Sequence, residues 1–186
     1  MIQRFPYYCL GVCVFLLVAC IRKQEDMHHD SVAPTHHLSG AFDSLRQVPA
    51  SEMEFIIGQT IYAPIYSEIY FMNDQSKILL GATLSIHNVD PDSVLVVTKV
   101  DYYDSKGKLL KKYLSKPGLL NPMETKDFVV DLMEKEGGTG ANFLIEWRSA
   151  HKVSEPLVEA IMISASSSRG VSFVSRGKVV RQFGKF

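Results

Sequence analysis

Cysteine is scarce in this chain, and its three occurrences, Cys9, Cys13 and Cys20, all lie within the first twenty residues. The rest of the chain therefore offers no thiol for a cysteine nucleophile, a cysteine-ligated structural zinc ion or a blue-copper centre. It also has no cysteine pair that could form a disulfide. Folding must rest on a hydrophobic core alone, which a domain of this size can supply.

An excess of charge is absent as well, because 20 Lys and Arg residues are balanced by 20 Asp and Glu residues. Nucleic-acid-binding proteins normally carry a basic excess, so we expect no nucleic-acid partner. Hydrophobic residues make up 46% of the chain and charged residues 22%, which is typical of a globular protein. The length of 186 residues predicts one folded domain.

The N-terminus contains a targeting signal. Residues 7–19 form an uncharged, mostly apolar run, which is too short for a spanning helix of about 20 residues and typical of a secretory signal peptide. The run ends in the string LVAC at residues 17–20, which resembles the bacterial lipobox. This resemblance implies cleavage before Cys20 and attachment of diacylglycerol to its sulfur, so that acyl chains anchor the protein to the lipid bilayer.

We therefore predict a signal peptide at residues 1–19 and a lipid-anchored protein of the bacterial cell envelope, facing the periplasm or the exterior. No Asp directly follows Cys20, and by resemblance to lipoprotein sorting this permits delivery to the outer membrane; anchoring in the plasma membrane is the other possibility. An uncleaved N-terminal helix is the alternative to lipidation. It would also place the rest of the chain outside the cytoplasm.

Residues 20–58 are predicted to be the lipidated cysteine and a flexible tether. The early part is polar and lacks periodicity, and a flexible chain of this length spans roughly 35 Å. Residues 38–48 include apolar positions near helical spacing, which suggests a short amphipathic turn. Four of the six histidines lie in the tether: His28, His29, His36 and His37. Imidazole pairs can bind Zn²⁺ or Cu²⁺, but a polar linker that is rich in histidine is the simpler interpretation.

Beyond the tether, apolar and polar residues alternate with the period of two that is typical of half-buried strands. Residues 78–87 show the alternation most clearly, and turn residues recur every 8–15 positions up to about residue 175. This pattern predicts an all-β fold over residues 59–182, a single Ig-like β-sandwich of about seven or eight antiparallel strands. An open barrel is the alternative.

Several strings in this region, in order, resemble a family of small bacterial envelope lipoproteins catalogued as the domain of unknown function numbered 3124. The strings are IYAPIYSEIY, ATLSIHNVDPDS, VDYYDSKGKLLKKYL, GGTGANFLIEW and GVSFVSRG. The resemblance covers residues 60–180 and implies a secreted or lipid-anchored single domain. It implies no activity, so it brings no catalytic residues with it.

Three tyrosines, Tyr62, Tyr66 and Tyr70, have a spacing that predicts one face of a single strand. An aromatic row of this kind could stack on a sugar or a peptide. The alternative is that this face packs on neighbouring strands, because tyrosine is also a common strand former.

Enzymatic signatures are weak. The glycine-rich string at residues 137–140 is not followed by Lys-Ser/Thr and leads into a strand, so a loop with positive φ is favoured over a phosphate-binding loop. No nucleophile elbow occurs. The histidines beyond the tether are His87 and His151. Either one could form a catalytic site with a carboxylate such as Glu146 or Glu159 only if the fold brings these side chains together.

The sequence thus favours a non-catalytic binding or scaffolding module, whose partners would be the bilayer through acylated Cys20 and an envelope protein or cell-wall polymer. No cofactor is expected apart from a metal ion on the tether. A periplasmic metal-capture protein that uses the four tether histidines is the first alternative. An envelope hydrolase with an unrecognised site is the second.

Overall fold

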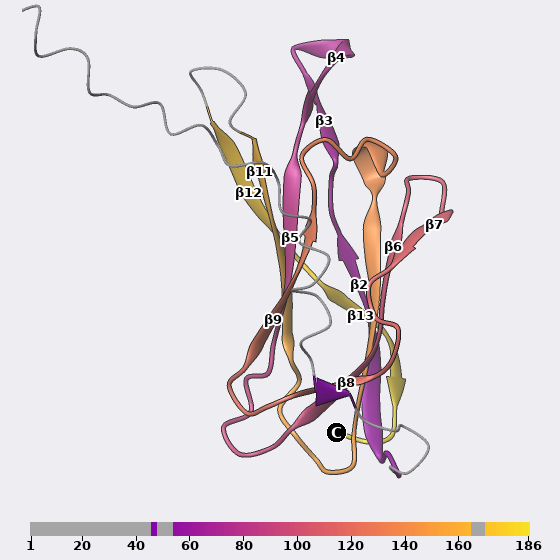
Figure 1. Ribbon diagram of the computed structural model, residues 1–186, viewed down its shortest axis with the longest axis vertical. Helices are drawn as coiled ribbons and strands as arrows, with labels where there is room; N and C mark the ends of the chain where they lie inside the picture. Colours follow the sequence, from indigo (N-terminus) through magenta and orange to yellow (C-terminus); the bar gives the residue numbers. More distant parts are fainter. Residues whose placement is uncertain (1–45, 48–53, 165–169) are drawn as a thin grey trace, which may run out of the picture. The chain divides into compact units, whose positions relative to one another are not determined.

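Antiparallel strands dominate the computed structural model, which describes residues 46–47, 54–164 and 170–186 (Figure 1). All of these residues belong to one unit, Ser39–Phe186. Within the described residues the one helical element is a 3₁₀ turn, η3 (Gly138–Gly140). No helix in this part of the chain is long and apolar enough to cross a membrane.

The larger sheet has seven strands, which follow the order β1-β8-β6-β10-β2-β13, with β7 paired to β6 beside this path. Its central strands are β6, β10 and β2, and β10 pairs with β2 over eight residues. The bounds are β1 (Arg46–Gln47), β2 (Ile57–Pro64), β6 (Leu95–Tyr103), β7 (Leu109–Lys112), β8 (Gly118–Leu120), β10 (Asn142–Ser149) and β13 (Lys178–Phe183).

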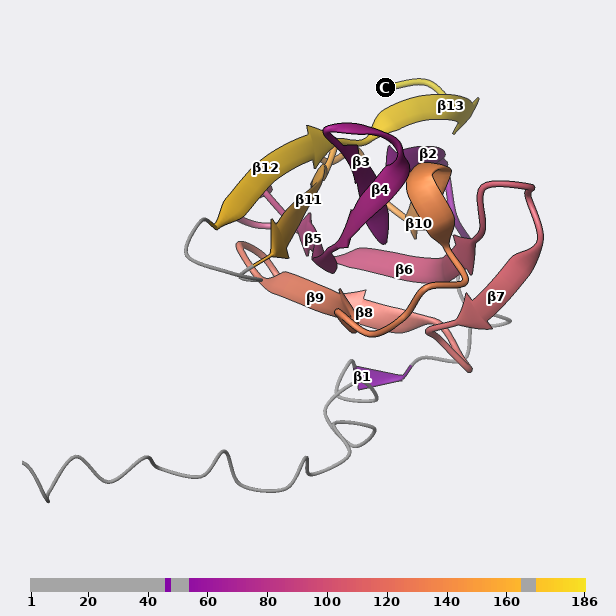
Figure 2. The ribbon, with the colours of Figure 1, turned by 90° about the horizontal axis from the view of Figure 1, so that it is seen from above.

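The second sheet has four strands in the order β12-β11-β5-β9. It forms the opposite side of the sandwich, as the view from above shows (Figure 2). A separate hairpin of β3 and β4 extends from one end of the molecule. The bounds are β3 (Glu68–Phe71), β4 (Asn73–Leu79), β5 (Gly81–His87), β9 (Thr125–Val130), β11 (Leu157–Ser164) and β12 (Val171–Arg176).

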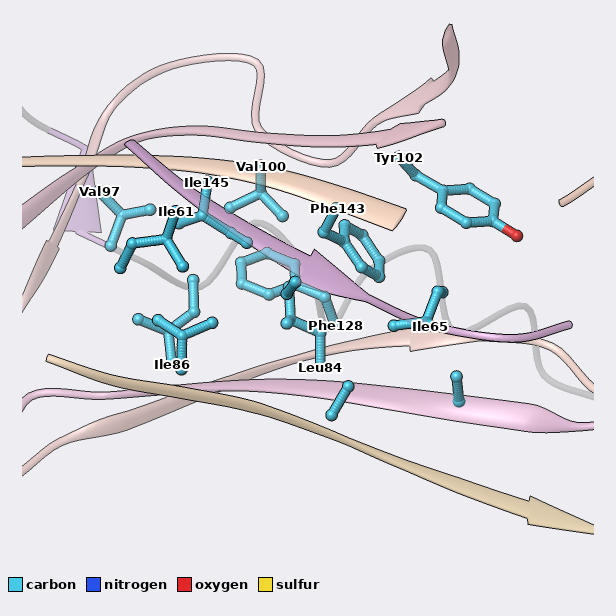
Figure 3. Close-up of a cluster of buried hydrophobic side chains, with 14 of the residues drawn as sticks. Ile61, Ile65, Leu84, Ile86, Val97, Val100, Tyr102, Phe128, Phe143 and Ile145 are labelled. Carbon is cyan, nitrogen blue, oxygen red and sulfur yellow. The ribbon is translucent and has the colours of Figure 1, made fainter. Parts of the chain in front are cut away.

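The core lies between the two sheets because alternate residues of each strand point inward. Leu84 and Ile86 of β5 face Val100 of β6 and Ile145 of β10 (Figure 3), and all four side chains are buried. Trp147 is fully buried in the same layer. Each such side chain stabilises the fold by about 1.5–3 kcal/mol relative to an exposed one.

The predicted β-sandwich is confirmed, and the open-barrel alternative is wrong because the two sheets remain separate. At one side the chain passes from the smaller sheet to the larger one at Gly177, between β12 and β13. The described residues contain more strands than the expected seven or eight. Of the additional strands, β1, β3 and β8 are two to four residues long and too short to show an alternating pattern. β4 and β13 are longer but mostly exposed.

The sheet begins earlier than the sequence suggested. Arg46 of β1 pairs with Leu119 of β8, and β2 begins at Ile57, so both strands reach into the segment assigned to the tether. The predicted signal peptide and Cys20 lie outside the described residues, as does most of the proposed amphipathic turn.

Candidate binding cavity

A cavity of about 500 Å³ lies where β6, β7 and β9 approach the connection that leads to β10. This is the end of the sandwich from which the β3–β4 hairpin extends (Figure 1). Its apolar lining consists of Tyr102, Leu110, Tyr113, Val129, Val130 and Met133. Its charged lining consists of Lys111, Asp131, Glu134, Lys135 and Glu136. An apolar wall with a few polar groups is the usual composition of a small-ligand site.

Three hydroxyl and carboxyl groups meet beside the cavity. The Tyr102 hydroxyl donates a hydrogen bond of 2.6 Å to Glu134 Oε2. Ser67 Oγ lies 2.8 Å from the Tyr102 hydroxyl and also donates to Glu134 Oε2 over 3.2 Å. Because Ser67 and Tyr102 are buried, these bonds offset the cost of removing their hydroxyls from water.

The second carboxylate oxygen of Glu134 orders the loop. Glu134 Oε1 accepts hydrogen bonds from the backbone N–H groups of Glu136 at 2.5 Å and Gly137 at 3.3 Å. One glutamate therefore joins the loop after β9 to β6 and to the segment before β3. The wall of the cavity is consequently formed before any ligand arrives.

Both cavity tyrosines remain neutral over the physiological range. Burial raises the pKa of Tyr102, and its hydrogen bond to Glu134 raises it further. Burial also raises the pKa of Tyr113. The Tyr113 hydroxyl donates to the backbone oxygen of Val129 over 2.7 Å, which fixes its ring in the wall.

Aromatic contacts continue from this wall into the core. The Tyr113 ring centroid lies 5.7 Å from that of Phe128 and 5.4 Å from that of Phe143. Lys111 Nζ lies 4.2 Å from the Tyr113 ring centroid, which is within range of a cation–π interaction. The side chains that line the cavity are thus supported by packed groups behind them, as a rigid site requires.

Gly137 allows the loop to pass close to the buried hydroxyls. A Cβ atom at this position would lie 1.9 Å from the Tyr102 hydroxyl oxygen and 2.3 Å from Ser67 Oγ. Gly138 has a φ of +72°, as expected for this glycine-rich string, and the string leads into β10 as predicted. The string therefore packs against Tyr102 and Ser67, beside the cavity.

The cavity can bind an apolar group and orient it by polar contacts at its rim. Asp131 Oδ1 accepts from the backbone N–H of Met133 over 2.7 Å, which holds the rim in place. The charged lining residues include two lysines and three carboxylates. A ligand with an apolar body and polar or charged ends would match this arrangement.

The predicted row of tyrosines does not form, because the chain leaves the sheet at Pro64. Tyr62 lies on β2, Tyr66 follows the strand and packs against Phe173 with ring centroids 5.8 Å apart, and Tyr70 lies on β3 with Lys77 Nζ 5.1 Å from its ring. The prediction of one strand face is therefore wrong, and none of the three lines the cavity.

His87 and Glu159 are brought together on the outer face of the smaller sheet. His87 Nε2 lies 3.9 Å from Glu159 Oε1, and Nδ1 lies 2.8 Å from Thr125 Oγ1. Glu146 belongs to the other sheet and pairs with Lys99 at 2.8 Å. His151 lies in the loop after β10, as expected, and neither histidine lines the cavity.

The histidines of the tether, His28, His29, His36 and His37, lie outside the described residues, so metal capture stays a prediction. Within the part of the chain that the structure describes, no group of three or more His, Cys, Asp or Glu side chains is arranged to hold a metal ion.

Sequence reasoning missed Ser67, Tyr102, Tyr113 and Glu134. One usable signal was present: Tyr102 falls on the inward-facing side of its strand, where a hydroxyl needs a partner. The partners themselves lie 35 and 32 residues away along the chain, and no local pattern marks them.

Comparison with known proteins confirms the family that the motifs suggested. A family model described as "Protein of unknown function (DUF3124)" matches residues 58–180. No curated protein matches the chain. A solved structure, "Crystal Structure of Thermotoga maritima 1070", is similar with a TM-score of 0.39 and 10% identity, over 68% of this chain and 96% of that chain.

Proposed function

This chain belongs to the DUF3124 family of proteins of unknown function, and we propose that it is a lipid-anchored binding module of the bacterial cell envelope. In this proposal Cys20 carries the acyl chains, and the cavity binds an apolar group of an envelope protein or cell-wall polymer. The LVAC string at residues 17–20 supports the anchor.

The observation that carries the binding role is the preformed cavity. A volume of about 500 Å³ falls within the range of about 300–1,000 Å³ that is typical of ligand sites. Its polar wall is already hydrogen-bonded through Glu134, so binding would order few groups and lose little entropy.

Site-specific photocrosslinking in intact envelopes tests this role. A benzophenone side chain replaces Met133, which lines the cavity and is 69% exposed. The matched control carries the same group at Met123, which is 68% exposed and lies in the turn between β8 and β9, away from the cavity.

We expect a discrete crosslinked product from position 133 that position 123 does not give. A Leu110→Trp change, which fills part of the cavity, should reduce this product at least about tenfold. Identical products from both positions, or a product that Leu110→Trp leaves unchanged, would contradict binding in the cavity.

A further inference from the structure

The outer face of the smaller sheet carries a contiguous apolar patch. Ile163 is 57% exposed, Val174 55%, Ile161 42% and Val129 41%. The patch is continuous because Ile161 pairs with Val174 on one side and with Thr83 on the other, and Thr83 pairs with Val129. Contiguous apolar patches on soluble proteins commonly mark interaction surfaces.

Strand register arranges this face in four neighbouring rows, of which one, Leu157, His87 and Thr125, lies beyond the end of β12. The other three rows begin on β12. The central row is Val174, Ile161, Thr83 and Val129. One neighbouring row is Arg176, Glu159, Ser85 and Asp127, and the other begins Ser172, Ile163 and Gly81.

Opposite charges stand at the two ends of one row. Arg176 lies on the edge strand β12, and Asp127 lies on the edge strand β9. Three strand spacings of about 4.8 Å separate these edges, so the two side chains are too far apart to pair within one copy. Glu159 lies beside Arg176 in the same row, and Asp127 accepts a hydrogen bond from Ser85 over 2.6 Å. A half-turn of a second copy brings the single cation of each row over the edge carboxylate of the other row.

We propose that this face binds a second copy of the chain, through a two-fold axis that runs parallel to the strands between β11 and β5. A two-fold interface uses the same patch on both copies. Under this operation β12 of one copy lies over β9 of the other, and β11 lies over β5.

The side chains then match in charge and in size. Arg176 of each copy faces Asp127 of the other, and Val174 faces Val129. Ile163 faces Gly81, where Leu132 lies within 3.8 Å of the position a Cβ atom would take, so this contact is also apolar. Packed sheets lie about 10 Å apart, and the strands of one sheet are rotated by about 30° relative to those of the other. This rotation displaces facing edge strands by only about 4 Å along their length, a distance that an arginine side chain can bridge.

The same geometry suits two chains in one membrane. An axis parallel to the strands puts both β1 segments at the same end of the dimer, so both tethers can reach one bilayer; this point rests on the proposed anchor. From strand spacing and rise, the face covers about 450 Å² per copy, less than the about 800 Å² of a standard interface. The dimer is therefore weak in solution and is favoured where anchoring concentrates the copies.

Charge-pair variants of the full chain test the dimer. In Arg176→Asp the facing residues are both acidic, and in Asp127→Arg they are both basic. Each variant alone should associate at least about tenfold more weakly than the wild type. An equimolar mixture of the two variants should associate again. In the mixed dimer the Asp introduced at position 176 faces the Arg introduced at position 127, and the unchanged Arg176 of one variant faces the unchanged Asp127 of the other.

Sedimentation in density-matched detergent measures the protein mass, and Arg181→Asp, on exposed β13, is the control that should leave association unchanged. Restored dimers in the mixture support the proposal, and a folding defect could not produce them. A wild-type chain that is monomeric at about 1 mM, or a mixture that stays monomeric, overturns it. Neither result depends on acylation of Cys20 or on the cavity.

Discussion

A few individual side chains shape the cavity at the end of the sandwich. Tyr102 brings a hydroxyl into the interior, where an unpaired one would cost about 1–3 kcal/mol. Ser67 and Glu134 satisfy it. Glu134 in turn fixes the loop through two backbone N–H groups, so a polar contact shapes an otherwise apolar wall.

This environment predicts a loss of stability at high pH. Burial in the folded state raises the pKa of Tyr102 above the ordinary tyrosine value of 10.0, so above pH 10 the unfolded chain loses this proton more readily than the folded chain does. Its contribution to stability is complete below pH 10 and is lost as the pH rises towards the folded pKa, by at most about 1.4 kcal/mol per pH unit.

Urea unfolding between pH 8 and 11 measures this dependence, and Tyr102→Phe is the matched variant. We expect the wild type to lose stability more steeply than Tyr102→Phe above pH 10, although Tyr113 contributes the same trend in both proteins. Parallel curves for the two proteins would contradict the burial of an un-ionised Tyr102.

The pattern of residues in the sequence predicted which face of a strand a side chain occupies, but not which side chains it contacts. His87 follows the alternation of residues 78–87 and lies on the outer face of its strand. Its neighbours Thr125 and Glu159 come from strands β9 and β11, and only strand pairing brings them together. For the same reason the Ser67–Tyr102–Glu134 contact could not be predicted from the sequence.

Among the elements, long alternating strands were predictable and short ones were not. β11 alternates regularly between accessible and buried residues, as the period of two predicts for a half-buried strand. β8 gives no such signal, because its three residues are all buried and show no alternation. β13 is mostly exposed, and two of its six residues are charged. It pairs with β2 across a bulge, and Val179 is its contact with the hydrophobic core.

Two glycine turns offer a test of how the β9–β10 connection is packed. Gly137→Ala should destabilise the fold by about 1–3 kcal/mol beyond any backbone cost, because the new Cβ would displace the hydroxyls of Tyr102 and Ser67. Gly107→Ala is the control: its φ is +80° and no atom lies within 4 Å of the added Cβ, so only the left-handed backbone costs about 1–2 kcal/mol.

Thermal and urea unfolding compare these variants. Gly137→Ala should unfold at a lower temperature than the wild type and should also weaken crosslinking at position 133, whereas Gly107→Ala should leave crosslinking intact. Equal losses of stability with unchanged crosslinking would mean that the connection does not support the cavity.

At the scale of the whole molecule, the sequence predicted an all-β domain and attachment to a membrane. The cavity at one end of the sandwich could be identified only in the folded structure. One sheet buries its inner face in the core and leaves apolar residues outside. Both sheets contribute to the cavity: β6 and β7 from the larger sheet and β9 from the smaller one, together with the connection after β9. The proposed ligand site and the proposed dimer face therefore lie on different parts of the sandwich, one at its loop end and one on the smaller sheet.

Lipid anchoring at Cys20 is the claim on which the location and the class of partner depend. Intact-mass spectrometry of the natural protein, extracted from its own membranes, tests it most directly. We expect a chain that begins at Cys20 and carries two or three acyl chains, in the membrane fraction. A chain that retains residues 1–19 and an unmodified Cys20, recovered from the soluble fraction of the cell, would contradict it.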